Sequence, residues 1–411
     1  MSYRALTQVV SPGFFPIGFL ARLPYACTPL ATLILLQATT GSYTFAGAAG
    51  AAQFIAIAAG GSVIGVLADR FGHRLIGATT AVGNIVALVG IIAATHAERT
   101  TMFVAAVFAG LTQPQIGPLV RVHWSQLVHA RNEQRLLPTA LSYEAAADET
   151  SFVAGPAIVG LLTPVATPIG PIAPIAATIA LLAGATLPFA LLHSGPRVPR
   201  PRRSTTPGTP LPRRPLAAMF VAMAAIGAIF GALQVGVTAY SNSIGQPGAA
   251  GLIYAEFGVG SALAGAACAW LPWRFTLRQR YVTFSATLLI GTLMLLAGGA
   301  LLALPTTVAL ASVTVAPYMI CLYTLTERIA PPHRAAVAMT VLCAGGPLGT
   351  AAGRAVAGRL ADLHGSTGAF LVAPITATGA LLLAVVLVAV DRGRGTWLGQ
   401  EQRTDSHSPM A

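Results

Sequence analysis

Long apolar runs constrain this chain more than any other feature of its sequence. Runs of about 20 or more apolar residues, the length of a bilayer-spanning helix, recur along the chain and alternate with short polar segments. Charged residues make up 9% of the 411 residues and hydrophobic residues 55%, whereas roughly 25% of a soluble domain is charged. In lipid, each backbone polar group must be bonded within the protein, so the runs are expected to be helices. The sequence predicts an all-α membrane protein.

The apolar runs and the polar breaks between them predict twelve transmembrane spans in two groups of six. The first group occupies 14–38, 44–68, 74–96, 101–126, 138–163 and 168–193. The second group occupies 216–242, 249–272, 281–304, 306–329, 335–360 and 366–390.

Two polar segments lie outside these spans, and neither has enough apolar residues to bury a core of its own. One is rich in arginine, proline and serine, and the other is the C-terminal tail. We therefore expect an N-terminal six-helix bundle over 1–193, a basic cytoplasmic linker over 194–215, a C-terminal six-helix bundle over 216–390 and a disordered cytoplasmic tail over 391–411.

A short internal repeat suggests that the two bundles are related. Ala154-Gly155-Pro156 in the fifth span is echoed by Gly345-Gly346-Pro347 in the eleventh, and an Ala/Gly-rich stretch follows each. Related six-helix halves are typical of a large class of transporters. The echo favours two pseudo-symmetric halves.

All 24 basic residues are arginines, and those outside the spans gather on alternate connections. The opposite connections hold little more than Arg99. Because positive residues favour the cytoplasmic side, both termini are expected in the cytoplasm. The net charge of +12 is attributed to these orienting loops, so a nucleic-acid partner is not expected. The all-arginine, Ala/Gly-rich composition suggests a GC-rich bacterial genome, and hence the bacterial plasma (inner) membrane.

Several kinds of site find no support in the sequence. The four cysteines lie inside predicted spans without a paired spacing, and the histidines lack metal-ligand spacing, so no metal or cofactor is expected. No phosphate-binding glycine loop occurs in a suitable context, which disfavours transport driven by ATP. Gly345, Gly349 and Gly353 repeat every fourth residue, a spacing that lets membrane helices approach closely.

The connection between the second and third spans carries the most specific motif. It reads Gly65-Val66-Leu67-Ala68-Asp69-Arg70-Phe71-Gly72-His73-Arg74. This closely resembles the loop signature of the major facilitator superfamily, from which only His73 departs. The resemblance implies two rocking six-helix halves, a monomer, and a conformational latch formed by Gly65, Asp69, Arg70, Gly72 and Arg74. Gly65 would permit close helix contact and Gly72 a tight turn.

A second resemblance lies in the fifth span. Gly155-Pro156, followed by Gly160, looks like a degenerate form of the motif found in antiporters of that family. Ala146 and Ala147 stand where an upstream glycine would be expected. The resemblance implies an antiporter.

Charged residues inside the spans are candidate functional sites, because a charge at the centre of a helix costs about 2.5–3.5 kcal/mol on insertion scales. The candidates for proton coupling and charge pairing are Arg22, Arg121, Glu144, Asp148, Glu149 and Glu256, and Arg354 lies in the eleventh span. Similar depths in the membrane predict that Arg22 pairs with Asp148 or Glu149, and that Arg121 pairs with Glu144. These pairs are either purely structural or couple proton entry to the change of state.

Polar neutral side chains supply the candidates for substrate contact. In the family the central cavity is built chiefly from the first, fourth, seventh and tenth spans. The resemblance thus implies a cavity that includes Tyr25, Gln113, Gln234 and Tyr318. Hydrogen bonding between helices is the alternative role for each.

The sequence predicts a secondary transporter that moves a small solute by alternating access. A proton-coupled exporter of drug-like or amphipathic compounds is favoured, and a proton-symporting importer of a sugar, organic acid or other metabolite is the alternative. A membrane-embedded enzyme is disfavoured because the spans hold no nucleophile–base set, and a sensor because no soluble signalling domain is present.

Overall fold

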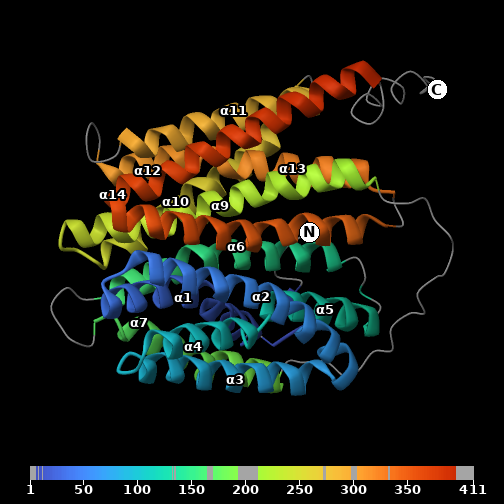
Figure 1. Cartoon of the computed structure of the whole chain (residues 1–411). Coiled ribbons are helices and arrows are strands. Elements are labelled where there is room, and N and C mark those ends of the chain that lie inside the picture. Colours follow the sequence, from blue (N-terminus) through green and yellow to red (C-terminus); the bar gives the residue numbers. More distant parts are fainter. Residues whose placement is uncertain are drawn as a thin grey trace. The chain divides into compact units, whose positions relative to one another are not determined.

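The structure of the chain is a computed structural model. It describes residues 6–7, 9–11, 13–131, 133, 136–163, 170–192, 212–271, 275–297, 303–331 and 334–394. All regular structure in these residues is helical (Figure 1). Most of the predicted linker and most of the predicted tail lie outside the described residues. The described residues 213–215 of the linker and 391–394 of the tail are helical, so the prediction of a disordered tail is wrong for 391–394.

The helices of the N-terminal region begin with three long ones. The whole set comprises α1 (Phe14–Thr40), α2 (Tyr43–Phe71), α3 (His73–Ala94), α4 (Arg99–Leu111), α5 (Ile116–Ala130), α6 (Leu137–Leu162), α7 (Ala173–Leu181) and α8 (Leu187–Leu192). A π-helical turn, Leu182–Thr186, joins α7 to α8. The predicted span 101–126 is therefore divided into two helices. Pro114 lies at this break, where a proline supplies no backbone N–H and disfavours a helical residue before it.

The second group of helices contains the longest continuous stretch. It comprises α9 (Arg213–Ser243), α10 (Ala249–Ala267), α11 (Leu277–Met294), α12 (Leu304–Ser312), α13 (Val315–Ile329) and α14 (Ala335–Arg394). Within α14, Gly365 has a φ of 65° and a ψ of −157°, so two helical segments meet there at a kink. Glycine reaches this left-handed φ without the steric cost of a Cβ atom.

Ten helical stretches within the described residues are long and apolar enough to cross a membrane. One of them, Val337–Val390, has 54 residues and contains the kink at Gly365. The helix α6 has 26 residues but is not among the ten, and it carries three carboxylates. The chain is thus an all-α, multi-pass membrane protein, and the predicted count of twelve spans depends on α6 and on the two segments of α14.

Packing divides the chain into two compact units. The first comprises Met1–Thr205, Gln234–Gly258 and Arg354–Ala369, and the second comprises Thr206–Leu233, Val259–Gly353 and Phe370–Ala411. This division cuts across the predicted halves, because parts of α9, α10 and α14 belong to the first unit. The predicted boundary at the linker therefore stays a prediction.

Small residues bring the helices of each unit close together. In the first unit, a Cβ added at Gly60 would lie 2.4 Å from the Leu111 carbonyl oxygen of α4. In the second unit, a Cβ at Gly353 would lie 2.2 Å from the Ala228 carbonyl oxygen of α9, which confirms the close approach predicted from the glycine spacing. Membrane helices associate through such contacts because lipid supplies no hydrophobic drive between them.

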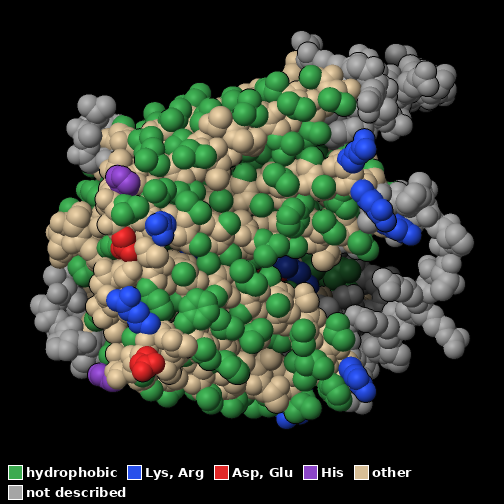
Figure 2. All heavy atoms as spheres, viewed as in Figure 1, with side chains coloured by type: hydrophobic (Ala, Val, Ile, Leu, Met, Phe, Trp, Pro, Cys, Tyr) green, Lys and Arg blue, Asp and Glu red, His purple; other side chains and the backbone are tan. Residues whose placement is uncertain are grey.

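The outer surface suits a lipid environment. Hydrophobic side chains spread over the face seen in Figure 2, and most of its charged side chains lie near two opposite edges. Large apolar residues are freely exposed, as at Leu192 (72%), Leu161 (71%) and Leu263 (67%). Extensive apolar exposure of this kind marks a membrane-facing surface.

Candidate functional site

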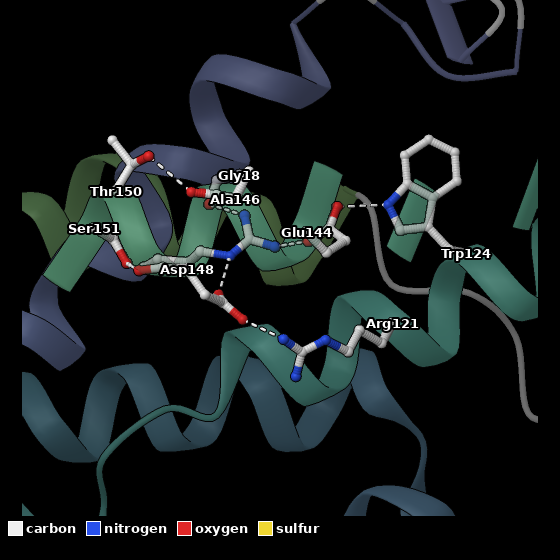
Figure 3. A network of polar contacts seen from close by, with 9 residues as sticks. Gly18, Arg121, Trp124, Glu144, Ala146, Asp148, Thr150 and Ser151 are labelled. Atoms are coloured by element: carbon white, nitrogen blue, oxygen red, sulfur yellow. Dashed lines mark hydrogen bonds and ion pairs between the residues drawn. The ribbon is translucent and has the colours of Figure 1, made fainter. Parts of the chain in front are cut away.

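A cluster of four charged residues joins α1, α5 and α6 in the first unit (Figure 3). At its centre Arg22 of α1 is only 4% exposed. Its Nε donates to Asp148 Oδ1 at 2.9 Å, its Nη1 donates to the Gly18 carbonyl oxygen at 2.9 Å, and its Nη2 forms an ion pair with Glu144. One guanidinium thus holds two carboxylates of α6. We call Arg22, Arg121, Glu144 and Asp148 the charge quartet.

Glu144 is the enclosed carboxylate of the quartet. Its side chain is fully buried, and besides the ion pair it accepts a hydrogen bond of 2.6 Å from the indole Nε1 of Trp124. Trp124 is itself 0% exposed and packs edge-on against Phe14 at 5.3 Å between ring centroids. The buried carboxylate therefore has both a cation and a neutral donor, as a buried charge requires.

Asp148 is the accessible carboxylate. It lies one helical turn after Glu144 on the same face of α6, and its side chain is 23% exposed. Its Oδ2 accepts from Arg121 Nη2 at 2.5 Å, so Asp148 bridges α1 and α5. A Cβ at Gly117 of α5 would lie 3.2 Å from both carboxylate oxygens, which shows that a glycine leaves room for the bridge.

The structure bears on both predicted pairs. Arg22 does pair with Asp148, as predicted. The predicted pair of Arg121 with Glu144 is wrong, because Arg121 pairs with Asp148 and Glu144 pairs with Arg22. Trp124 occupies the place opposite Glu144. Arg121 precedes Trp124 by about one turn of α5, and Asp148 follows Glu144 by about one turn of α6. Arg121 therefore lies opposite Asp148.

Two other predicted carboxylates stand apart from the charge quartet. Glu149 is exposed on a neighbouring face of α6, and Glu256 of α10 is partly exposed. Among the described residues neither forms an ion pair. The four carboxylates predicted as candidates thus divide into Glu144 and Asp148, which share Arg22, and two that stand apart from this cluster.

The predicted cavity residues do not form one cluster. Tyr25 of α1 is partly buried and packs edge-on against Phe152 at 6.1 Å. Gln113 is buried at the break between α4 and α5, and no hydrogen-bond partner for its carboxamide lies among the described residues. Gln234 of α9 is bonded to Arg354 of α14 in the first unit. Tyr318 of α13 belongs to the second unit, where it stacks on Tyr281 at 6.0 Å.

In the loop motif, Gly72 has the geometry expected of it and Gly65 does not. Gly72 ends α2 with a φ of 101°, so a residue without a Cβ is needed for this turn. A Cβ at Gly65 would meet no described atom within 4 Å, so the close helix contact expected of Gly65 is absent from the described part of the structure. The Arg70 guanidinium lies 5.2 Å from the Phe71 ring centroid, and Arg74 is in the first turn of α3. The side chain of Asp69 lies outside the described residues.

The antiporter-like residues lie where α6 crosses its neighbours. A Cβ at Gly155 would come within 2.6 Å of the Ala26 Cβ of α1. A Cβ at Gly160 would lie 2.5 Å from the Gly248 carbonyl oxygen, directly before α10. Pro156 is inside the helix between them. These small residues therefore set two tight helix crossings.

One contact had no precursor in the sequence analysis. Asp362 of α14 accepts three hydrogen bonds at the start of α2: from Ser42 Oγ at 2.9 Å, from the Tyr43 backbone N at 2.7 Å and from the Thr44 backbone N at 2.8 Å. A carboxylate there is stabilised by the helix dipole and by N–H groups that lack a partner within the helix. The carboxylate thus caps a helix 320 residues away in sequence.

The fold and the buried charges define a polytopic membrane transporter, and comparisons identify its family. The model of the Major Facilitator Superfamily matches residues 14–341. The chain belongs to this superfamily. It is therefore a secondary transporter and not an enzyme.

Solved structures show the same fold at low identity. The nucleoside transporter NupG has 16% identity and a TM-score of 0.71, over 92% of this chain and 97% of that one. The POT family transporter PepTSo has 12% identity and a TM-score of 0.66, over 93% and 98%. A bacterial homologue of the iron transporter ferroportin has 15% identity and a TM-score of 0.66, over 95% and 100%. No curated protein matches the chain.

Proposed function

We propose that this transporter is a proton-coupled exporter of drug-like or amphipathic compounds. The charge quartet carries the proposal. It places a partly exposed carboxylate, Asp148, between two arginines, while the second carboxylate, Glu144, is sealed away from solvent. A proton can reach the first group without opening the protein around the second.

The coupling step follows from the charges. The quartet holds two arginines and two carboxylates and is neutral as drawn. Protonation of Asp148 removes one negative charge, so Arg121 loses its partner and Arg22 retains only Glu144. Because Asp148 is the bridge between α1 and α5, its neutralisation loosens the contact between these helices. Return of the carboxylate to its charged form restores the bridge and completes a cycle.

The direction of transport rests on the resemblance of Gly155-Pro156 to the antiporter motif. Gly155 and Gly160 set the crossings of α6 with α1 and with the start of α10. The helix α6 carries the coupling carboxylates and is thus held by its neighbours at two points that follow these carboxylates in the chain. An exporter that exchanges substrate for protons uses such a helix to transmit the change in protonation.

A proton-symporting importer of a metabolite is the second candidate. Two structures with this fold are the nucleoside transporter NupG and the POT family transporter PepTSo. An importer would use the same charge quartet, with substrate and proton moving together. The two candidates differ in the sign of the coupled flux.

The remaining expectations complete the proposal. Twelve spans in two pseudo-symmetric halves would bring both termini to the cytoplasmic side of a bacterial plasma membrane. The loop from Gly65 to Arg74 would latch one of the two end states. The transporter would function as a monomer.

Flux in proteoliposomes tests the proposed function. The purified full chain is reconstituted, a pH gradient is imposed, and movement of a mixed set of dyes, drugs and metabolites is followed for wild type, Asp148→Asn and Glu149→Gln. Glu149 is a matched control, since it follows Asp148 directly on α6 but lies outside the quartet.

We expect counter-movement of compounds and protons in wild type and Glu149→Gln, and only passive exchange in Asp148→Asn. Movement of compounds together with protons would establish the importer. Full gradient-driven transport by Asp148→Asn would refute the coupling role of the quartet.

A further inference from the structure

Arg354 of α14 is a fully buried arginine in the first unit, and its contacts among the described residues include no carboxylate. Its exposed fraction is 0%, and within the described part of the chain it has no ion-pair partner. Its Nε donates to Gln234 Oε1 at 2.8 Å, and its Nη2 donates to the same oxygen and to the Pro29 carbonyl oxygen at 3.1 Å. Its Nη1 is buried, and no hydrogen-bond partner for it lies among the described residues. The partners that it does have are neutral.

The guanidinium occupies a slot built by α1, α2, α9 and α14. The Phe54 ring of α2 lies against it, with its centroid 4.8 Å from the Arg354 Cζ. A Cβ at Gly50 would lie 2.5 Å from Nη1, and a Cβ at Gly47 would lie 2.5 Å from the Arg354 backbone oxygen. Gly50 thus leaves the space that this side chain fills, and Gly47 lets the backbone of α14 approach α2. The slot fits an arginine closely.

The charge of Arg354 is nevertheless unbalanced. Moving a cation out of water is costly unless an anion or a full set of acceptors replaces the water. Gln234 and Pro29 supply two neutral acceptor atoms for the five donors of the guanidinium. A side chain that only filled space would need no charge here. The missing component is an anion.

We propose that Arg354 binds the carboxylate of the transported substrate, so that the substrates are amphipathic organic acids. This inference rests on the proposed transport function and narrows its substrate class. A guanidinium matches a carboxylate through two parallel hydrogen bonds. The side chain of Gln234 orients the guanidinium, and Phe54 presents an apolar face to the body of the acid. In this structure Gln234, Pro29 and Phe54 contact the fully buried guanidinium, which would become available when α14 separates from α1 and α2.

Ligand-induced stabilisation tests this assignment directly. The thermal unfolding midpoint of the purified full chain is measured with a panel of water-soluble aromatic acids beginning with benzoate, and with benzylamine and benzyl alcohol. The variants are Arg354→Gln, Arg354→Lys and Arg359→Gln. Arg359 is a matched control, because it is an exposed arginine five residues further along the same helix.

We expect the acids, and neither the amine nor the alcohol, to raise the midpoint of wild type and of Arg359→Gln. In Arg354→Gln the apparent affinity for the acids should fall at least about tenfold, since the charge-assisted bonds are lost. Arg354→Lys should fall between the two, because it keeps the charge but loses the paired geometry. Equal stabilisation of Arg354→Gln, or no stabilisation of wild type by any acid, would overturn the assignment.

The outcome can be separated from that of the proposed function. If proteoliposomes show proton-driven flux of amines or neutral compounds that Arg354→Gln leaves intact, transport stands and the substrate class proposed here fails. If no compound moves, the transport proposal fails, while the binding of acids at Arg354 is still decided by the unfolding midpoints.

Discussion

Arg22 and Arg354 are both buried in the first unit, and their surroundings differ in charge. Arg22 is 4% exposed and holds two carboxylates of α6, so its charge is balanced within the protein. Arg354 is 0% exposed and contacts a carboxamide, a carbonyl and an aromatic ring. In the proposed cycle, Arg22 loses one of its two carboxylate partners when Asp148 is protonated. Arg354 needs a partner that the described chain does not supply.

The difference separates two tasks within one bundle. A neutral cluster can be switched by the smallest possible ligand, because one proton changes its net charge. An unbalanced arginine selects a larger ligand by charge. If both proposals hold, coupling and recognition belong to different helices, with coupling on α1, α5 and α6 and recognition on α14, α9 and α2.

The largest expected loss of stability comes from replacing Arg22 by methionine, and the same replacement at Arg354 should cost less. Arg22→Met leaves Glu144 buried without a cation and should cost about 3–5 kcal/mol of stability. Arg354→Met removes a charge without a described counter-charge and takes one donor from two neutral groups, the Gln234 carboxamide and the Pro29 carbonyl, at a cost of about 1–3 kcal/mol. Chemical unfolding in detergent measures both. Equal losses would mean that Arg354 has a counter-charge after all.

The next effect separates the two carboxylates of the quartet. Glu144→Gln should cost about 1–3 kcal/mol, because Arg22 loses its buried counter-charge but keeps Asp148 as a partner. Asp148→Asn should cost less, since its side chain is 23% exposed and water can compensate. Proton-driven flux should show the reverse order, with the greater loss in Asp148→Asn. If the variant with the greater loss of stability also had the greater loss of proton-driven flux, the quartet would be structural only.

Two glycines of α2 test how tightly Arg354 is held. A Cβ at Gly47 would lie 2.5 Å from the Arg354 backbone oxygen and 3.1 Å from the Gly358 Cα, and backbone gives way poorly. Gly47→Ala should therefore destabilise the packing of α2 against α14 by about 1–3 kcal/mol. Gly50→Ala meets the movable end of the guanidinium, so it should cost less stability and weaken acid binding. Thermal unfolding with and without benzoate distinguishes the two effects.

Substitution of Asp362 has the smallest expected effect on stability. Unlike the other substitutions, it is expected to strengthen acid binding at Arg354. Asp362→Ala removes three hydrogen bonds at the start of α2 and, as for other helix caps, should cost about 0.5–2 kcal/mol. Because this contact holds α14 against α2 in the structure that covers Arg354, its loss should raise the apparent affinity of Arg354 for acids. Titration with benzoate measures the change. A weaker affinity would show that the cap supports the binding site.

The helices could be predicted from the sequence because lipid forces long apolar runs into helical form. Pro114 gives no clear signal in the sequence, because prolines inside membrane helices are often tolerated, as at Pro24 and Pro29 of α1. The break at Pro114 is therefore visible only in the structure. The similar depth of the two residues in the membrane correctly predicts that Arg22 pairs with Asp148, one of its two predicted partners.

The sequence could not predict which neighbouring helix each side chain faces, because that depends on how each helix is rotated about its axis. Two residues of similar depth can lie on opposite sides of a helix, so depth alone joins Arg121 to Glu144, although Trp124 occupies that position. For the same reason the sequence shows Arg354 as a charge within a span but does not show its slot. It likewise places Gln234 on a cavity helix without the arginine to which it is bonded.

The hydrogen bond from Trp124 to Glu144 has an optical consequence. Indole emission depends on the charge next to the ring, and here a carboxylate of the quartet accepts directly from the indole N–H at 2.6 Å. The sequence contains four tryptophans. With Trp270, Trp273 and Trp397 replaced by phenylalanine, a single emitter would remain beside the coupling cluster. The wavelength and intensity of its fluorescence would then report on the surroundings of Glu144 in unlabelled protein.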